Sequence, residues 1–312
     1  MPDKSLKAVI DLGSHSALLL IVQIENGRLL PLKERFRITR LGQEVNNLGY
    51  LPYENQQRAL DVLEEYRHEL QTAGCSKVTV LGTEALRRAQ NARELVQKIE
   101  QRFGWEVRVL SPQEEATYAY LGAISAFENF GEKNFTVIDV GGASTELTLG
   151  WGVQIKSDAS FPIGAARLAE EFGFKEKLKR PDLPKIREFL DGIFDEKKLQ
   201  SLTTNALLVG TGGTATTLAA VKMQMETYDP EKIRRVSLTL DELLLLFEKM
   251  NALALEERSQ LKGLEAGRED VILYGTLIYI HILQRTEKWR IKVSPRGLRY
   301  GFLIAQMQNQ TP

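Results

Sequence analysis

The chain has 312 residues, about twice the usual length of one domain, which favours two domains. Hydrophobic residues make up 43% and charged residues 26%, as in ordinary soluble globular proteins. The 41 Lys and Arg residues balance the 41 Asp and Glu residues, which excludes the general polyanion-binding surface of nonspecific nucleic-acid-binding proteins.

Cysteine usage and hydropathy exclude further classes. The single Cys75 rules out a disulfide framework and a cysteine-based metal site. Residues 1–5 lack the apolar core of a signal peptide, and the longest nearly apolar stretch, residues 271–283, is too short to span a bilayer and is expected to be a buried helix. We expect a cytoplasmic protein with no membrane, protein or specific nucleic-acid partner.

The first third of the chain has the pattern of a β-meander followed by alternating helices and strands. The strongest hairpin signal is the turn Asn26-Gly27 between two apolar runs. Strands are expected at residues 7–12, 17–24, 29 onward, 78–81 and 107–110. Helices are expected over residues 54–72, between the strand at 78–81 and residue 103, and from Ser111 onward. This order predicts an α/β domain with a mixed sheet.

The strand and turn at the N-terminus occur a second time. Residues 9–16 read Val-Ile-Asp-Leu-Gly-Ser-His-Ser, and residues 137–144 read Val-Ile-Asp-Val-Gly-Gly-Ala-Ser. Asp139 follows Asp11 by 128 positions, about one domain length. We therefore predict duplicated α/β domains facing each other across a cleft. They are expected at residues 1–122 with a C-terminal helix at 297–312, and at residues 123–296.

The small residues of both turns suit phosphate binding, because their N–H groups can form an anion-binding nest. An aspartate beside such a nest repels phosphate unless a cation lies between them. Mg²⁺ fits, since it is held by one or two carboxylates and keeps waters and phosphate oxygens as other ligands. The candidate phosphate-binding residues are Gly13, Ser14 and His15 in the first turn, and Gly141, Gly142, Ala143 and Ser144 in the second.

A third glycine-rich element, Gly212-Gly213-Thr214, follows an apolar strand and begins a helix. Helix N-termini bind phosphate, but the element matches neither the Walker nor the dinucleotide fingerprint. A ligand contact and a tight packing turn are equal alternatives here. Glu146 lies two residues beyond Ser144 on the same strand face, so it is a candidate metal ligand or an ordinary exposed strand residue.

Two adjacent glutamates begin the helix at Ser111. Ser111 and Glu114 have the spacing of a capping box, which gives Glu114 a structural role. Glu115 has no such role and is the candidate general base for water; the alternative is a solvated acid in the first turn. Arg87 and Arg268 lie in Gly-containing turns next to helices, where they could contact phosphate or form a basic surface.

Together these residues resemble the exopolyphosphatase/guanosine pentaphosphate phosphohydrolase family, over residues 10 to about 301. The resemblance implies the actin/Hsp70/sugar-kinase-like superfold, with two RNase H-like domains of mixed five-stranded sheets around a central cleft. The motifs that carry it are residues 11–16, 85–87, 115–116, 139–146, 164–168, 212–216 and 267–272.

The resemblance also implies the activity, which is Mg²⁺-dependent release of the terminal phosphate of inorganic polyphosphate or of guanosine pentaphosphate, giving guanosine tetraphosphate. Mn²⁺ is an alternative ion. Glu115 matches the family's catalytic glutamate and Arg87 its phosphate-contacting arginine. Asp139 and Glu146 match the metal-associated acids, and Asp11 matches the acid of the first loop.

Two positions depart from the family pattern, His15 for a usual Asn and Leu18 for a usual basic or polar residue. Two other functions of the superfold are alternatives. A small-molecule kinase would need a pocket for a phosphoryl acceptor, and a noncatalytic guanosine tetraphosphate sensor would not need Glu115. The sequence does not rank polyphosphate against guanosine pentaphosphate, because both end in the same phosphoanhydride, and it does not set the oligomeric state.

Overall fold

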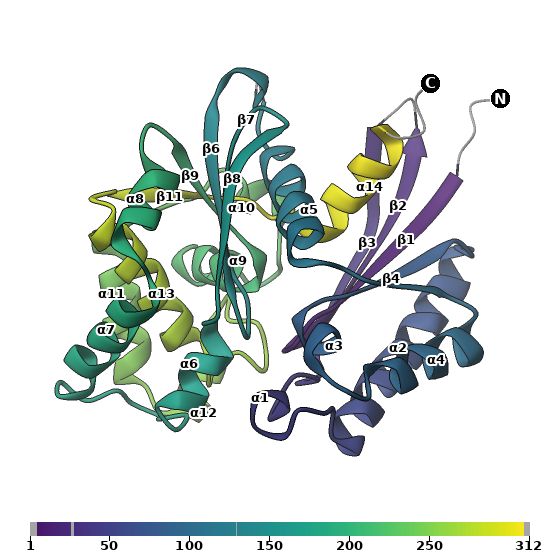
Figure 1. Ribbon diagram of the computed structural model, residues 1–312, viewed down its shortest axis with the longest axis horizontal. Coiled ribbons are helices and arrows are strands. Elements are labelled where there is room, and N and C mark those ends of the chain that lie inside the picture. Colours follow the sequence, from purple (N-terminus) through teal and green to yellow (C-terminus); the bar gives the residue numbers. More distant parts are fainter. Residues whose placement is uncertain (1–4, 26–27, 129, 309–312) are drawn as a thin grey trace. The chain divides into compact units, whose positions relative to one another are not determined.

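A computed structural model describes residues 5–25, 28–128 and 130–308 (Figure 1). The chain divides into two compact units, residues 1–115 with 302–312 and residues 116–301. Both boundaries between the units lie within helices, α5 (Pro112–Ile124) and α14 (Leu298–Gln308). The sequence places the first boundary after residue 122, also within α5, and the second before residue 297, beside α14.

The first unit is built on a five-stranded mixed sheet in the order β3-β2-β1-β4-β5. The central strand β1 runs antiparallel to β2 and parallel to β4. The strands are β1 (Ser5–Leu12), β2 (Ser16–Glu25), β3 (Arg28–Ile38), β4 (Val78–Gly82) and β5 (Glu106–Val109). The Asn26-Gly27 turn lies outside the described residues.

Helices α2 (Tyr53–Ala73) and α4 (Ala92–Phe103) cover one face of this sheet (Figure 1). The buried stripe of α2 includes Leu63 and Tyr66, and the Tyr66 hydroxyl donates to the carbonyl of Ala17 in β2 at 2.8 Å. As predicted, α2 ends before Gly74, which has a φ of 68°. Two short helices, α1 (Val45–Leu48) and α3 (Glu84–Arg88), also belong to this unit.

The second unit has a six-stranded mixed sheet in the order β10-β11-β9-β6-β7-β8. Its strands are β6 (Asn134–Val140), β7 (Thr145–Trp151), β8 (Gln154–Phe161), β9 (Leu207–Thr211), β10 (Ser237–Thr239) and β11 (Arg290–Val293). The expectation of five strands in this unit is wrong. Strand β10 adds a sixth, which pairs with β11 and is held by the fully buried Leu238. A strand of three residues is too short to show a periodic pattern in the sequence.

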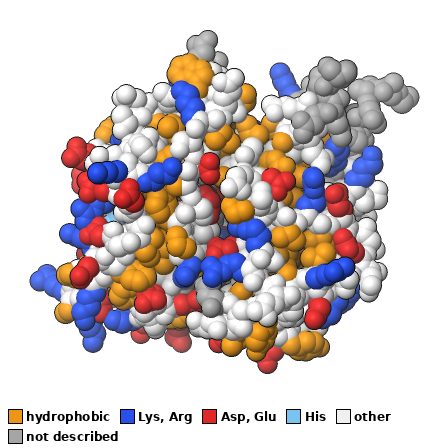
Figure 2. Space-filling model, viewed as in Figure 1, with side chains coloured by type: hydrophobic (Ala, Val, Ile, Leu, Met, Phe, Trp, Pro, Cys, Tyr) orange, Lys and Arg blue, Asp and Glu red, His pale blue; other side chains and the backbone are white. Residues whose placement is uncertain are grey.

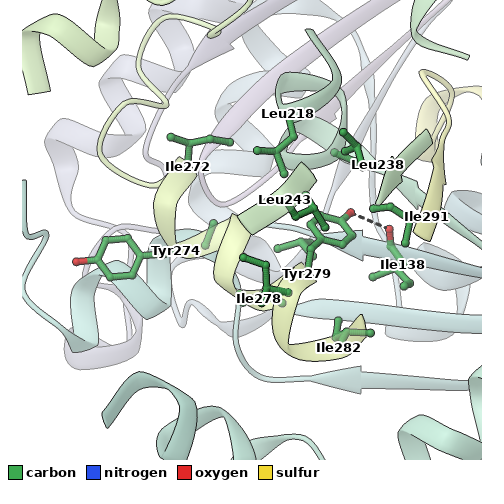
Figure 3. Close-up of a cluster of buried hydrophobic side chains, with 14 of the residues drawn as sticks. Ile138, Leu218, Leu238, Leu243, Ile272, Tyr274, Ile278, Tyr279, Ile282 and Ile291 are labelled. Atoms are coloured by element: carbon green, nitrogen blue, oxygen red, sulfur yellow. Dashed lines mark hydrogen bonds between the residues drawn. The ribbon is translucent and has the colours of Figure 1, made fainter. Parts of the chain in front are cut away.

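The stretch of residues 271–283 forms the buried helix that its hydropathy predicts, α13 (Ile272–Arg285). It packs against α11 (Leu240–Ala252) and α9 (Gly212–Lys222), with Ile278 and Leu218 among the buried side chains (Figure 3). The Tyr279 hydroxyl donates to the Ile138 carbonyl at 3.2 Å. Burial raises its pKa well above the ordinary value, so the hydroxyl keeps its proton.

The second unit contains further helices. They are η1 (Phe130–Glu132), α6 (Ala165–Glu171), α7 (Asp182–Ile193), α8 (Glu196–Thr203), α10 (Pro230–Ile233) and α12 (Leu255–Ser259). None of the helices in the described ranges is both long enough and apolar enough to cross a bilayer.

The two units repeat one arrangement. Strand β6 lies between antiparallel β7 and parallel β9, just as β1 lies between β2 and β4. In each unit an aspartate, Asp11 or Asp139, is the penultimate residue of the central strand. The duplicated α/β fold that the sequence predicts is confirmed.

Candidate functional site

The first turn joins β1 to β2 and is held by its own backbone. The Gly13 N–H donates to the Ser16 carbonyl at 2.9 Å. The loop after β3 stabilises this turn. The Gly42 N–H donates to the Ser14 carbonyl at 2.8 Å, and two further N–H groups donate to the His15 carbonyl. A Cβ at Gly42 would lie 2.7 Å from that of Ser14, so this approach requires glycine.

Two side chains accompany this turn. A Cβ at Gly13 would lie 3.9 Å from both Oδ1 of Asp11 and Oγ1 of Thr83. Thr83 directly follows β4, where Leu81 is the register partner of Asp11. The sequence analysis missed Thr83, although the end of a parallel strand beside Asp11 was the signal that could have found it.

Glu115 and Arg87 form a largely enclosed ion pair in the first unit. Nη1 of Arg87 donates to Oε2 of Glu115 at 2.5 Å and to the Leu110 carbonyl at 2.8 Å. Burial raises the pKa of the Glu115 carboxyl above its ordinary value, although the Arg87 guanidinium opposes the shift. A carboxylate with a raised pKa is a better proton acceptor near neutral pH than an ordinary one.

The neighbouring Glu114 behaves differently, as its spacing predicts. Its Oε2 accepts hydrogen bonds from the Ser111 N–H at 2.8 Å and from the Ser111 hydroxyl at 2.9 Å. The capping box is therefore confirmed, and these bonds lower the pKa of Glu114. The fold separates the two adjacent glutamates into a structural acid and a candidate base.

Glu84 is a third acid near this pair, and the sequence analysis missed it. Its Oε1 accepts from Nη1 of Arg88 at 3.2 Å, while its Oε2 is buried without a hydrogen-bond partner in the described part of the chain. Its negative charge contributes to the raised pKa of Glu115. The signal was its place three residues before Arg87 on one short helix.

Replacing Glu84 with Gln should therefore lower the pKa of Glu115. A general base works deprotonated, so activity falls as pH drops through its pKa, and the acidic limb of the profile of kcat/KM against pH should move to lower pH. The matched control is Glu94→Gln, an exposed acid in the first turn of α4. A limb that stays in place in the Glu84 variant would contradict this role.

The second turn, in the other unit, repeats the first. The Gly141 N–H donates to the Ser144 carbonyl at 3.0 Å. This bond is equivalent to the one from Gly13 to Ser16, 128 positions earlier. A Cβ at Gly164 would lie 2.5–2.7 Å from the backbone of residues 141–143, so the start of α6 packs tightly on the turn. Within the described residues, the N–H groups of Gly142 and Ala143 have no hydrogen-bond acceptor, which suits a nest for an anion.

An acid pair lies beside the second turn. Asp139 and Glu146 are direct register partners on β6 and β7, and Glu146 is buried and accepts from the Ser160 hydroxyl at 3.0 Å. In the described ranges no three or more His, Cys, Asp or Glu residues are grouped to hold a metal. Two carboxylates suit Mg²⁺, which keeps other ligands from water and phosphate. Asp11 belongs to the other unit, and its part in a metal site stays a prediction.

The start of α9 is packed around two charged side chains. A side chain on Gly212, whose φ is 76°, would overlap the Asp139 carboxylate, and one on Gly213 would overlap the Arg268 guanidinium. Arg268 is 7% exposed, and its Nε donates to Oε2 of Glu265 at 2.7 Å. The positive end of the helix dipole also lies at the helix N-terminus. An anion bound there would be stabilised both by the dipole and by the buried Arg268 cation.

Arg167 is a further cation near the second turn, and the sequence analysis did not select it. Its N–H donates to the Gly142 carbonyl at 2.9 Å. Its Nη1 is buried and has no hydrogen-bond partner among the residues that the structure describes. The signal was its position three residues after Gly164 in a small-residue motif.

Comparison with known proteins identifies the family. The profile of the Ppx/GppA phosphatase family matches residues 20–310. The chain belongs to the Ppx/GppA phosphatase family. The family resemblance deduced from the sequence motifs is thereby confirmed.

Two solved structures of Ppx/GppA-type proteins share the fold. The Aquifex aeolicus family member is 34% identical, with a TM-score of 0.80 over 99% of both chains. An exopolyphosphatase from Cytophaga hutchinsonii is 26% identical, with a TM-score of 0.89 over 98% of both chains. A bifunctional 3-dehydroquinate synthase/phosphatase of Fusobacterium nucleatum is 32% identical over 98% of this chain, which spans only 47% of that relative's length.

The predicted site residues divide between the two units. The first unit holds Asp11, Gly13, Ser14, His15, Arg87 and Glu115. The second holds Asp139, Gly141, Gly142, Ala143, Ser144, Glu146, Gly212, Gly213, Thr214 and Arg268. Within the second unit the Thr214 hydroxyl donates to the Val140 carbonyl at 2.8 Å, which ties the start of α9 to the end of β6. The roles of these residues toward phosphate and metal remain predictions.

Proposed function

We propose that this protein hydrolyses phosphoanhydrides, releasing the terminal phosphate of inorganic polyphosphate, of guanosine pentaphosphate, or of both. The family and the exopolyphosphatase from Cytophaga hutchinsonii support this substrate class. The observation that carries the proposal is the enclosed Glu115 carboxyl, held by Arg87 and with a raised pKa. A binding protein or sensor has no need of such a base.

In the proposed complex the second unit binds phosphate. The N–H groups of Gly142 and Ala143, which lack acceptors among the described residues, would donate to its oxygens, and the guanidinium groups of Arg167 and Arg268 would offset its charge. Asp139 and Glu146 would hold Mg²⁺. When bound, that ion neutralises charge on the phosphate oxygens and orients them.

The proposed chemical step uses the first unit. Glu115 accepts a proton from water as the water oxygen bonds to the terminal phosphorus and the bond from phosphorus to the bridging oxygen breaks. The electron pair of that bond leaves with the shortened chain. Arg87 holds the Glu115 carboxylate in place and presents positive charge to the departing phosphate.

The direct test is phosphate release from each substrate, with Mg²⁺ present and no acceptor added. Release from either supports the hydrolase, and the ratio of kcat/KM ranks the two substrates. A kinase would release no inorganic phosphate, because it transfers the phosphoryl group to an acceptor. A sensor would bind guanosine tetraphosphate in calorimetry without hydrolysing either substrate, and both outcomes would overturn the proposal.

The hydrogen bond from Ser160 to Glu146 should tune the metal site. Ser160→Ala removes the donor, and losing a hydrogen bond to a metal-binding carboxylate typically weakens metal affinity about 10- to 100-fold. We expect the Mg²⁺ concentration for half-maximal activity to rise by about tenfold, with the same rate at saturating Mg²⁺. Ser157→Ala, three residues earlier on β8, is the control. An unchanged Mg²⁺ requirement in the Ser160 variant would count against Glu146 as a ligand.

A further inference from the structure

A cavity away from the candidate functional site lies in the unit of residues 116–301. A cavity of about 360 Å³ is lined by residues at the beginnings of β6 and β9, including Phe135 and Leu207. Asp139 and Thr211 lie at the other ends of the same two strands. Asp139 and Thr211 are each four residues further along their strands than Phe135 and Leu207, a distance of about 13 Å, so the cavity is separate from the acid pair and from the turn beyond it.

The walls of this cavity, here called the basic cavity, carry a local excess of positive charge. Lys133, Arg234, Arg235 and Lys292 line it, with Glu128 as its acid. The chain as a whole has equal numbers of acidic and basic residues, and on the face shown in Figure 2 the two kinds are interspersed. Among the described residues that line the cavity, four cations therefore face one acid, an excess that the balanced chain as a whole lacks.

Within the part of the chain that the structure describes, most of this charge has no acidic partner. Arg234 pairs with Glu231 at 2.5 Å. Across the described ranges, no carboxylate forms an ion pair with Lys133, Arg235 or Lys292. Like charges gathered around one cavity repel each other, so an anion that enters it is favoured by all of them.

The fold fixes these cations in place. Lys292 is within β11, opposite Ser237 of β10, and its Nζ lies 5.6 Å from the ring centre of Phe127, a cation–π contact. Arg235 directly precedes Val236, whose carbonyl accepts from the Val293 N–H at 3.0 Å. Lys133 immediately precedes β6. Lys292 is thus set on a paired strand, and the exposed Lys133 and Arg235 are each anchored beside one.

We propose that the basic cavity binds an oligophosphate anion, either free or carried by a nucleotide, at a site distinct from the proposed catalytic one. Lysine ammonium groups and an arginine fork are the side chains that bind phosphate oxygens best. The volume lies near the lower end of the range for small-molecule sites, which fits a short phosphate chain. The inference does not depend on the proposed hydrolysis.

The test counts binding sites for inorganic tripolyphosphate by calorimetry on the Glu115→Gln chain, chosen so that the probe is not consumed. We expect two sites there and one site after adding Arg235→Gln and Lys292→Gln. The control adds Lys197→Gln and Lys249→Gln, two exposed lysines whose removal changes the net charge equally, and should keep both sites. Equal stoichiometry and affinity in the cavity variant and its parent, or an equal loss in the control, would overturn the proposal.

Repeating the titrations with guanosine tetraphosphate separates the two sources of the anion. If the cavity substitutions remove a binding site for tripolyphosphate alone, the ligand of the cavity is a free phosphate chain. If they also remove a binding site for guanosine tetraphosphate, the cavity recognises the phosphate groups that both ligands share. Thermal melting of each variant checks that it is folded. Failure of the hydrolysis proposal would appear as wild-type protein that releases no phosphate, and it would leave the loss of one site in the cavity variant unchanged.

Discussion

Glu115→Gln should lower kcat by about 10²- to 10⁴-fold, the usual contribution of a positioned general base. Gln keeps the shape of the side chain but cannot take the proton of water, so phosphate release should be lost while substrate affinity stays within a few fold. Single-turnover rates and equilibrium binding, measured on the same protein, separate the two effects.

The neighbouring Glu114 provides the control for that variant. Gln at this position also completes a capping box, so Glu114→Gln should keep both the helix start and the activity. If Glu114→Gln and Glu115→Gln reduce the rate equally, the effect comes from the start of α5 and not from a base at Glu115.

Gly213→Ala is expected to have the second largest effect. An added Cβ would overlap the Arg268 guanidinium and displace it from the start of α9. Hydrogen bonds to charged groups contribute about 1.5–3 kcal/mol, so kcat/KM should fall roughly 10- to 100-fold. The control is Gly192→Ala in α7, where no atom lies within 4 Å of the new Cβ.

A double-mutant cycle distinguishes loss of the arginine from a general distortion of the turn. In an Arg268→Ala background, Gly213→Ala has no guanidinium to displace, so it should cost little more. Additive losses from the two substitutions would show that Gly213 acts on something other than Arg268.

The sequence predicts the repeated parts of this fold well, because the repeat is local. The Val-Ile-Asp-x-Gly pattern marks both central strands, and each turn closes with the same backbone hydrogen bond, from Gly13 or from Gly141. The two copies also share their register, because each aspartate lies opposite the residue seven positions later, but that residue differs. Asp139 faces Glu146 across β6 and β7, whereas Asp11 faces Leu18, so this cross-strand acid pair occurs in the second copy but not in the first.

Features that depend on tertiary packing could not be predicted. Nothing in the local sequence shows that one Glu84 oxygen is buried or that Nη1 of Arg167 lacks a partner among the described residues, because both depend on distant elements. Strand β10 was missed since three residues carry no measurable period. Glu114 and Glu115 could be told apart, because a capping box is set by spacing alone.

The most direct test of the central claim, that Glu115 takes the proton of the attacking water, is the pH dependence of single-turnover phosphate release. The wild-type rate should fall as pH drops through a pKa above the ordinary value for a glutamate, and the limb should vanish in Glu115→Gln, leaving a low rate that does not change with acidity. A Glu115→Gln protein that keeps the wild-type rate and the same acidic limb would contradict the account.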